Sequence, residues 1–241
     1  MNAQLSIRLC IVTPIGNEKS SICQFLDQVK HYLTVEDRML LIIDNVSVDG
    51  TREIVQQYLS EPGNEHILLI EAPENRCVAD AYIRGYREAL KLNPKWILEM
   101  DAGFSHQPKH IPEFVALMEQ GYDYAGGSRF LKGAQYNGGP YRRLLSQGGT
   151  WVAKMLLDCE LSDMTSGYQC YSRETLSRIL ERGIFSKGGF FQTEIRYFVS
   201  KLKWAEIPIT YDNVRQSVPF RYVADGVTGL IRLVKNSRCV S

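Results

Sequence analysis

Hydrophobic positions in the first hundred residues follow two alternating patterns. Runs that are apolar or β-branched at most positions occupy residues 5–13, 39–43, 66–71 and 96–100, and such runs are typical of buried strands. Between them, residues 20–33, 50–59 and 77–90 carry apolar side chains at helical spacing. This alternation predicts an α/β fold, with a mostly parallel central sheet flanked by helices and joined by right-handed crossovers.

The second half of the chain has a less regular pattern. Residues 122–125 and 204–209 predict two more strands, and residues 141–157 and 223–234 predict two amphipathic helices. Basic residues flank the last helix, namely Arg221, Arg232, Lys235 and Arg238. Because no linker, repeat or low-complexity segment interrupts the pattern, we expect one domain over residues 1–241.

Ligands of parallel α/β sheets bind beyond the carboxyl ends of the strands. We therefore expect a binding site among the loops at residues 13–18, 44–51, 72–77 and 101–108. Asp44 directly follows an apolar strand, where a carboxylate can accept hydrogen bonds from a nucleobase or ribose. Asp101 also follows a strand and suits a divalent cation that bridges phosphate oxygens, because hard cations prefer carboxylate ligands. The alternative is that Asp101 only begins a turn.

Two histidines, His106 and His110, lie four residues apart in the same region. A zinc site is disfavoured, because neither an H-E-x-x-H glutamate nor a nearby third histidine accompanies them. Phosphate-loop, G-x-G-x-x-G and G-x-S-x-G motifs are also missing from the sequence, which weakens ATPase, dehydrogenase and esterase interpretations.

Charge is balanced overall but unevenly distributed. The chain has 28 basic and 27 acidic residues, a net charge of +1, which argues against a protein that coats polyanions such as nucleic acid. Residues 1–123 carry 18 acids and 11 bases, whereas residues 124–241 carry 9 acids and 17 bases, and residues 124–157 contain no acid. Such asymmetry favours an anionic ligand in the second half, although helix surfaces that simply differ in charge would give the same count.

Composition also bears on the compartment. The six cysteines, at positions 10, 23, 77, 159, 170 and 239, form no C-x-x-C pair and are typical of reduced cysteines in a cytosolic protein. Residues 1–4 do not begin a signal-peptide pattern, and no apolar run approaches the ~20 residues of a membrane span. We expect a cytoplasmic protein, with peripheral contact to the cytoplasmic face of a membrane as an open alternative.

Six short motifs follow one another along the chain. They are residues 14–18 (PIGNE), 44–51 (DNVSVDGT), 101–108 (DAGFSHQP), 127–130 (GSRF), 141–146 (YRRLLS) and 163–168 (DMTSGY). In this order they resemble the family 2 glycosyltransferases with a GT-A fold, and within them the branch of polyprenol (dolichyl) phosphate mannosyltransferases and glucosyltransferases. The resemblance runs from about residue 7 to residue 215.

The resemblance implies an inverting hexose transfer from a nucleoside diphosphate sugar, of the GDP-mannose or UDP-glucose type, to a lipid-linked acceptor such as polyprenyl phosphate. The residues it implies at the donor nucleotide are Pro14, Gly16, Glu18, Asp44 and Asp101, with Asp101 also holding a divalent cation (Mg or Mn). The residues it implies at the acceptor phosphate are Arg129, Arg142, Ser146 and Arg215. Candidate catalytic residues are Asp101, Arg129 and Glu194, the last either a base or a residue of the helix surface.

Three positions depart from the family's motifs. Gly103 replaces the second aspartate of D-A-D, Gly16 replaces a tyrosine, and Asn45 replaces a second carboxylate. Two alternatives therefore stay open: transfer to a sugar hydroxyl during surface-glycan assembly, and a catalytically silent subunit that binds a nucleotide sugar.

Overall fold

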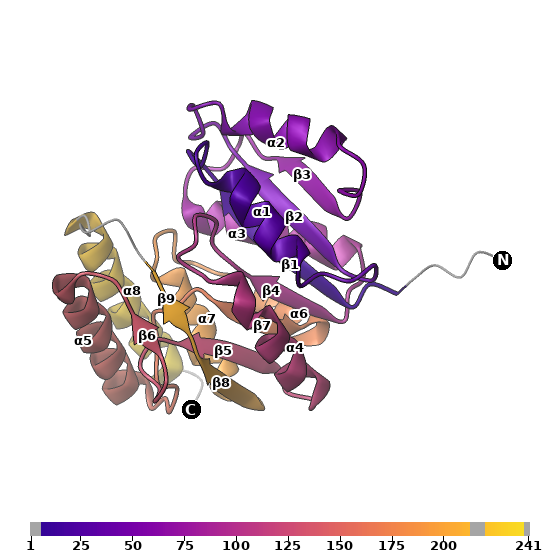
Figure 1. Cartoon of the computed structure of the whole chain (residues 1–241). Coiled ribbons are helices and arrows are strands. Elements are labelled where there is room, and N and C mark those ends of the chain that lie inside the picture. The colour runs from indigo at the N-terminus through magenta and orange to yellow at the C-terminus, as the bar shows by residue number, and fades with distance from the viewer. Residues whose placement is uncertain (1–5, 213–219, 239–241) are drawn as a thin grey trace.

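The structure is a computed structural model that describes residues 6–212 and 220–238, and its centre is a seven-stranded sheet covered by helices (Figure 1). In order across the sheet, the strands are β3 (Ile67–Glu71), β2 (Arg38–Ile43), β1 (Leu9–Ile15), β4 (Trp96–Glu99), β7 (Gln169–Ser172), β5 (Tyr124–Ser128) and β8 (Trp204–Pro208). A parallel pair, β6 (Gln135–Tyr136) and β9 (Thr210–Tyr211), forms a second small sheet.

Eight α-helices are formed by the described residues: α1 (Ile22–Lys30), α2 (Thr51–Ser60), α3 (Val78–Lys91), α4 (Ile111–Glu119), α5 (Pro140–Leu157), α6 (Arg173–Arg182), α7 (Phe191–Val199) and α8 (Phe220–Arg238). The helical positions that the sequence pattern predicts are confirmed for α1, α2, α3, α5 and α8. The predicted α/β fold with a mostly parallel central sheet flanked by helices is also confirmed.

One strand departs from the parallel arrangement. Strand β7 lies antiparallel between β4 and β5 and joins the two halves of the sheet. Its four residues include the buried polar side chain of Gln169, so they do not form the apolar run from which the other strands were predicted. Since β7 reverses direction, it begins at the edge where its neighbours end.

The core has one layer on each face of the sheet. Helices α1, α2 and α4 pack on one face, and α3, α6 and α7 pack on the other with parts of α5 and α8. Helix α3 lies so close to the sheet that a Cβ on Gly85 would come within 2.3 Å of Cγ1 of Val12. The buried cysteines Cys10, Cys159 and Cys170 are free thiols.

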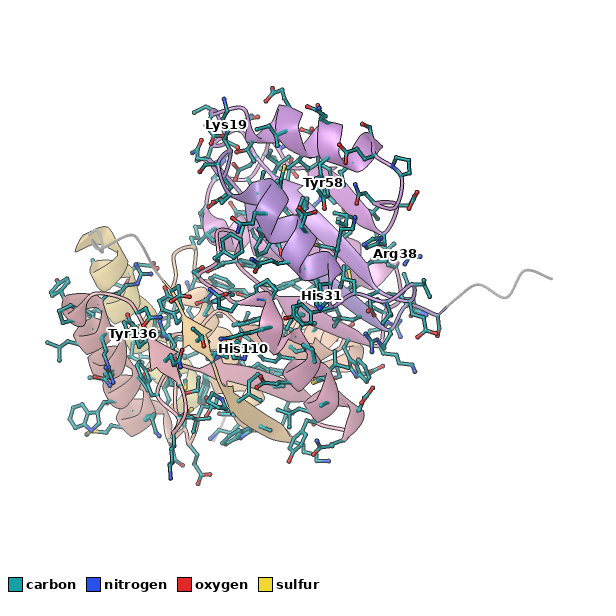
Figure 2. All side chains as sticks on the ribbon, viewed as in Figure 1. Lys19, His31, Arg38, Tyr58, His110 and Tyr136 are labelled. Atoms are coloured by element: carbon teal, nitrogen blue, oxygen red, sulfur yellow. The ribbon has the colours of Figure 1, made fainter. Side chains whose placement is uncertain are left out.

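The strand directions place one set of loops at a single edge. Strands β1, β2, β3, β4, β5 and β8 all end there, and β7 begins there. Figure 2 shows Lys19, from the loop after β1, on the same side as Tyr136, whereas Arg38 at the start of β2 lies on the opposite side. The loops at residues 16–21, 44–50, 100–107, 129–134 and 158–168 therefore surround one region.

Helix α5 has two different long faces. Its buried residues are Thr150, Ala153 and Leu157, whereas Leu144, Trp151 and Met155 are 69%, 63% and 64% exposed. The apolar side of this helix therefore points outward rather than into the core. Helix α8 lies beside α5 (Figure 1) and exposes Val227 and Ile231. We call the five exposed side chains Leu144, Trp151, Met155, Val227 and Ile231 the α5–α8 apolar face. No helix within residues 6–212 and 220–238 is long and apolar enough to span a bilayer.

Candidate functional site

The loops after β1 and β2 are joined by hydrogen bonds. Asn17, with φ of 58°, donates from Nδ2 to the carbonyl of Val46 (3.1 Å) and accepts at Oδ1 from the amide of Val48 (3.0 Å). The amide of Lys19 donates to Asp49 (3.0 Å). These bonds hold the two loops together as one rim of the site.

The residues predicted to bind the donor nucleotide lie along this rim. Pro14 is the second-last residue of β1, Gly16 follows the strand directly, and Glu18 lies two residues further on. Asp44 follows β2 directly, and its Oδ1 accepts the amide of Val46 (2.9 Å). The fold thus brings these four residues to the same edge of the sheet, as the motifs predict.

Asp101 lies two residues beyond β4, and its side chain is 43% exposed. The buried hydroxyl of Tyr82 donates to its Oδ1, and its own amide donates to Nδ1 of His106 (2.9 Å). Burial lowers the pKa of His106, so the ring is neutral at neutral pH and its proton lies on Nε2. This Nε2 is 3.8 Å from Oδ2 of Asp101. The carboxylate is thus oriented by two buried groups and open on its remaining side.

These oxygens fit the chemistry of a divalent cation. Asp101 offers an accessible carboxylate oxygen, and the carboxylate of Glu18 lies beside the loop that follows Asp101, within about 3 Å of the position that a Cβ on Gly103 would take. Carboxylate oxygens are the preferred ligands of Mg²⁺ and Mn²⁺. Within residues 6–212 and 220–238, no cluster of three or more His, Cys, Asp or Glu side chains could hold a metal. A cation here would therefore also need oxygens from a bound diphosphate or from water.

Further along the same edge of the sheet, two strands beyond β4, Arg129 directly follows β5 and pairs with Asp163. Its Nε and Nη2 donate to the two carboxylate oxygens of Asp163 at 2.7 and 2.9 Å, and Nη2 also donates to Thr165. Burial opposes ionisation of Asp163, but the guanidinium of Arg129 lowers its pKa to about 2. Both side chains are at least 95% buried, so Arg129 is a neutralised member of the wall rather than an isolated cation.

A second buried cation, Arg196, holds the backbone near this pair. Arg196 of α7 is completely buried and donates to the carbonyls of Ser166 (2.9 Å) and Gly127 (3.2 Å). Glu206 lies 3.5 Å from it and accepts the amide of Ser162 (2.6 Å). These bonds fix the loop before β7 against the end of β5.

The predicted acceptor residues of α5 face inward. Arg142 and Ser146 are one turn apart, on the side of α5 opposite Leu144, and both are half-buried. Tyr136 of β6 is close enough to respond to both arginines: burial raises the pKa of its phenol, and the charges of Arg129 and Arg142 both oppose that rise. The two guanidinium groups therefore act on one region. Arg215 lies outside the described residues.

The carboxylate of Glu194 in α7 is bonded to a different segment of the chain. It accepts the amides of Phe185 (3.2 Å) and Ser186 (3.1 Å). Burial raises its pKa, and these hydrogen bonds partly offset the rise. His110 is likewise engaged elsewhere, because its Nε2 accepts the amide of Thr210 (2.9 Å) and its Nδ1 lies 3.1 Å from Glu113. The two histidines therefore have separate partners.

Several residues of the site were not predicted. The role of His106 had a signal in the sequence, since it belongs to the motif at residues 101–108. Asp163 is likewise part of a motif, but its pairing with Arg129 depends on contacts across 34 residues. Tyr82 and Arg196 carry no local signal, because each lies in an amphipathic helix where such residues are commonly half-exposed.

Comparison with known proteins agrees with this geometry. A family model for glycosyl transferase family 2 matches residues 10–180. Polyprenol monophosphomannose synthase of Mycolicibacterium smegmatis is 29% identical over 208 residues, covering 85% of this chain and 77% of the relative. Undecaprenyl-phosphate mannosyltransferase of Micrococcus luteus is 28% identical over 225 residues, covering 92% and 90%.

Among solved structures, glucosyl-3-phosphoglycerate synthase of Mycobacterium tuberculosis, in complex with Mn²⁺, UDP and glucosyl-3-phosphoglycerate, has a similar fold. The TM-score is 0.68 at 14% identity, and the match covers 94% of this chain and 78% of the other. The seven-stranded sheet is thus of the GT-A type, and residues 10–180, which the family model matches, contain all six motifs. The chain belongs to glycosyl transferase family 2.

Proposed function

We propose that the protein transfers a hexose from a nucleoside diphosphate sugar to a polyprenyl phosphate, with inversion at the sugar carbon. The observation that carries this proposal is the arrangement of charge across the edge of the sheet. An accessible carboxylate, Asp101, lies on one side, and the inward face of α5, with Arg142 and Ser146, lies on the other. The two named relatives, a polyprenol monophosphomannose synthase and an undecaprenyl-phosphate mannosyltransferase, support it.

In this proposal the donor lies at the loops after β1 and β2, which hydrogen bonds join to one another. Pro14, Gly16 and Asp44 contact the nucleoside, and Asp101 approaches the diphosphate. A divalent cation bound there would neutralise the diphosphate and stabilise it as a leaving group. The ring of His106 holds the amide of Asp101 and so fixes the carboxylate.

The acceptor phosphate lies at Arg142 and Ser146. The phosphate groups of the sugar donor and of the acceptor repel one another. Positively charged side chains fixed by the fold must offset that repulsion. Segment 124–157 suits this requirement because it contains no acid. In our proposal Arg129 is a positioning residue for this wall, since its charge is already paired with Asp163.

A phosphate acceptor is ionised near neutral pH and needs no strong side-chain base. The carboxylate of Glu194 already accepts hydrogen bonds from the amides of Phe185 and Ser186, which agrees with a reaction that needs no side-chain base. A sugar-hydroxyl acceptor would instead need a base. Glu194→Gln should therefore leave transfer to polyprenyl phosphate largely unchanged.

The test measures nucleoside diphosphate release from GDP- and UDP-hexoses with polyprenyl phosphate or a saccharide as acceptor. We expect turnover when polyprenyl phosphate is the acceptor and none when the saccharide is the acceptor. We expect Arg142→Ala to lose the turnover with polyprenyl phosphate. Turnover only with the saccharide, abolished by Glu194→Gln in a variant that melts like the wild type, would favour the glycan alternative. Calorimetric donor binding without turnover under any condition would favour a silent subunit.

The lipid part of the acceptor would meet the α5–α8 apolar face. A groove of about 540 Å³ is lined by Phe130 and by Trp151 and Met155 of this face, together with polar side chains that include Gln147 and Lys154. An isoprenoid chain is apolar and fits the part of this groove formed by Phe130, Trp151 and Met155. We therefore also propose peripheral contact between this face and a membrane.

A further inference from the structure

Gly103 marks a place where a side chain is missing and another group fills the space. A Cβ built on Gly103 would lie 2.9 Å from Oε2 and 3.0 Å from Oε1 of Glu18. A side chain at position 103 and the present position of the Glu18 carboxylate thus exclude each other. The loop after β4 leaves this volume empty, and the loop after β1 occupies it with a carboxylate.

The position of Glu18 is fixed by the fold around it. Its amide donates to Oγ1 of Thr51 (2.8 Å), and its carbonyl accepts the amides of Ser21 (3.0 Å) and Ile22 (2.9 Å) at the start of α1. The hydroxyl of Ser21 donates to Oε2 (2.7 Å), which leaves the other carboxylate oxygen available. Asn17 anchors the same loop to the loop after β2.

We propose that Glu18 supplies the second carboxylate of the cation site, in place of a side chain at position 103. An aspartate at position 103 would present its oxygens to a certain volume. The carboxylate of Glu18, which reaches over Gly103 from the loop after β1, presents its oxygens to the same volume. Glu18 then compensates for the glycine at position 103, where the family's motif has an aspartate. Asp101 and Glu18 together hold the cation that bridges the donor diphosphate. This inference rests on the proposed function only in its donor half, because it requires a diphosphate and no acceptor.

The alternative roles of Glu18 make different predictions. If it contacts only the nucleoside, its removal weakens nucleotide binding equally with and without a cation. If it only caps α1 through Ser21, its removal lowers stability and leaves cation affinity unchanged. If Glu18 is a cation ligand, its removal weakens nucleotide binding only when the cation is present.

The experiment titrates Mn²⁺ by electron paramagnetic resonance in the presence of GDP and, in parallel, UDP, with no acceptor. Glu18→Gln and Asp101→Asn should each weaken Mn²⁺ binding by about tenfold or more. The matched control is Glu53→Gln, which removes one negative charge from the exposed first turn of α2, near Lys19. It should leave Mn²⁺ affinity within about twofold of the wild type, because rim charges act weakly.

A compensating pair sharpens the test. Gly103→Asp should raise Mn²⁺ affinity less in the wild-type background than in the Glu18→Ala background, because its Cβ would displace the Glu18 carboxylate from its present position. Glu18→Ala combined with Gly103→Asp should recover most of the affinity, since aspartate tolerates the φ of +74° at this position better than most residues. Recovery in the double variant also shows that loss in Glu18→Gln is not due to unfolding.

Unchanged Mn²⁺ affinity in Glu18→Gln would overturn the inference. So would an equal loss of nucleotide affinity in the presence of a chelator, or a double variant as weak as Glu18→Ala. Failure of sugar transfer to polyprenyl phosphate would refute the proposed function and leave this result unaffected, because Mn²⁺ binding is measured without acceptor.

Discussion

At the scale of single residues, charge is buried in pairs. The Arg129–Asp163 pair, with bonds of 2.7 and 2.9 Å, joins the end of β5 to the loop before β7. Asp163→Asn would leave the guanidinium buried without its partner, and we expect it to cost about 3–5 kcal/mol in the free energy of unfolding. Urea denaturation measures this cost. Glu174→Gln, at an exposed position in the first turn of α6, is the control and should change it by less than about 0.5 kcal/mol. Equal effects of the two substitutions would contradict the assignment.

Glu99 is a buried carboxyl group whose protonation has a testable consequence. It is fully buried and accepts hydrogen bonds from Tyr86, Tyr171, Gln169 and Gln192. Burial raises its pKa to about 7, above the ordinary value of 4.5. The folded protein therefore retains this proton after the unfolded chain has lost it. The stabilising contribution is complete below pH 4.5 and is lost as pH rises through about 7.

Glu99→Gln removes this titration. Between pH 5 and pH 8, the free energy of unfolding of the wild type should fall relative to that of the variant, by about 2–3 kcal/mol in total. Urea denaturation at several pH values gives the difference between the two curves. Because both proteins keep His106 and His110, the opposite trend of those buried histidines cancels in the difference. Parallel curves would show that Glu99 does not titrate in this range.

The residues of the site were predictable where they follow strands. Asp44 and Asp101 lie at strand ends that the local sequence marks, and strand direction alone brings them to one edge. The salt bridge between Arg129 and Asp163 was not predictable, because its two members are 34 residues apart and each also suits an exposed role. The cover of Gly103 by Glu18 likewise depends on how two loops meet.

At the scale of elements, the sequence predicted the positions of most helices and parallel strands. It did not predict β7, since Gln169–Ser172 gains its hydrogen bonds from neighbours on both sides rather than from a local pattern. For α5 the amphipathic pattern was correct, but periodicity cannot say which face is buried. Here small or short side chains, Thr150 and Ala153, face the core, and the larger apolar ones face outward.

This orientation of α5 leads to a prediction about membranes. Replacing Leu144 and Trp151 by serine should reduce sedimentation of the protein with lipid vesicles several-fold, since each removes exposed apolar area from the α5–α8 apolar face. Stability should change little, because neither side chain is buried. Val35→Ser, at a 77% exposed position before β2, is the control and should bind like the wild type. Equal binding of all variants would show that another surface meets the lipid.

At the scale of the whole molecule, charge is segregated along the chain. The first 123 residues have a net charge of −7 and the remainder +8, so the half that contains α5 and α8 is the basic one. Binding to vesicles with anionic lipid should therefore decrease as salt rises from about 0.01 M to about 1 M, as the Debye length shrinks from about 30 Å to about 3 Å. Binding to neutral vesicles should change much less. An identical salt response for both vesicle types would refute an electrostatic contribution.

The position of β7 in the sheet has a consequence for synthesis on the ribosome. Both of its neighbours, β4 and β5, precede it in the chain. A nascent chain that has emerged only as far as residue 168 therefore presents one unpaired edge of β4, which carries Ile97 and Leu98, and both edges of β5, because β8 also comes later in the chain. Open edges of this kind promote association with other chains. The edge of β4 thus stays open until residues 169–172 have emerged, and β5 has both of its partners only after residue 208.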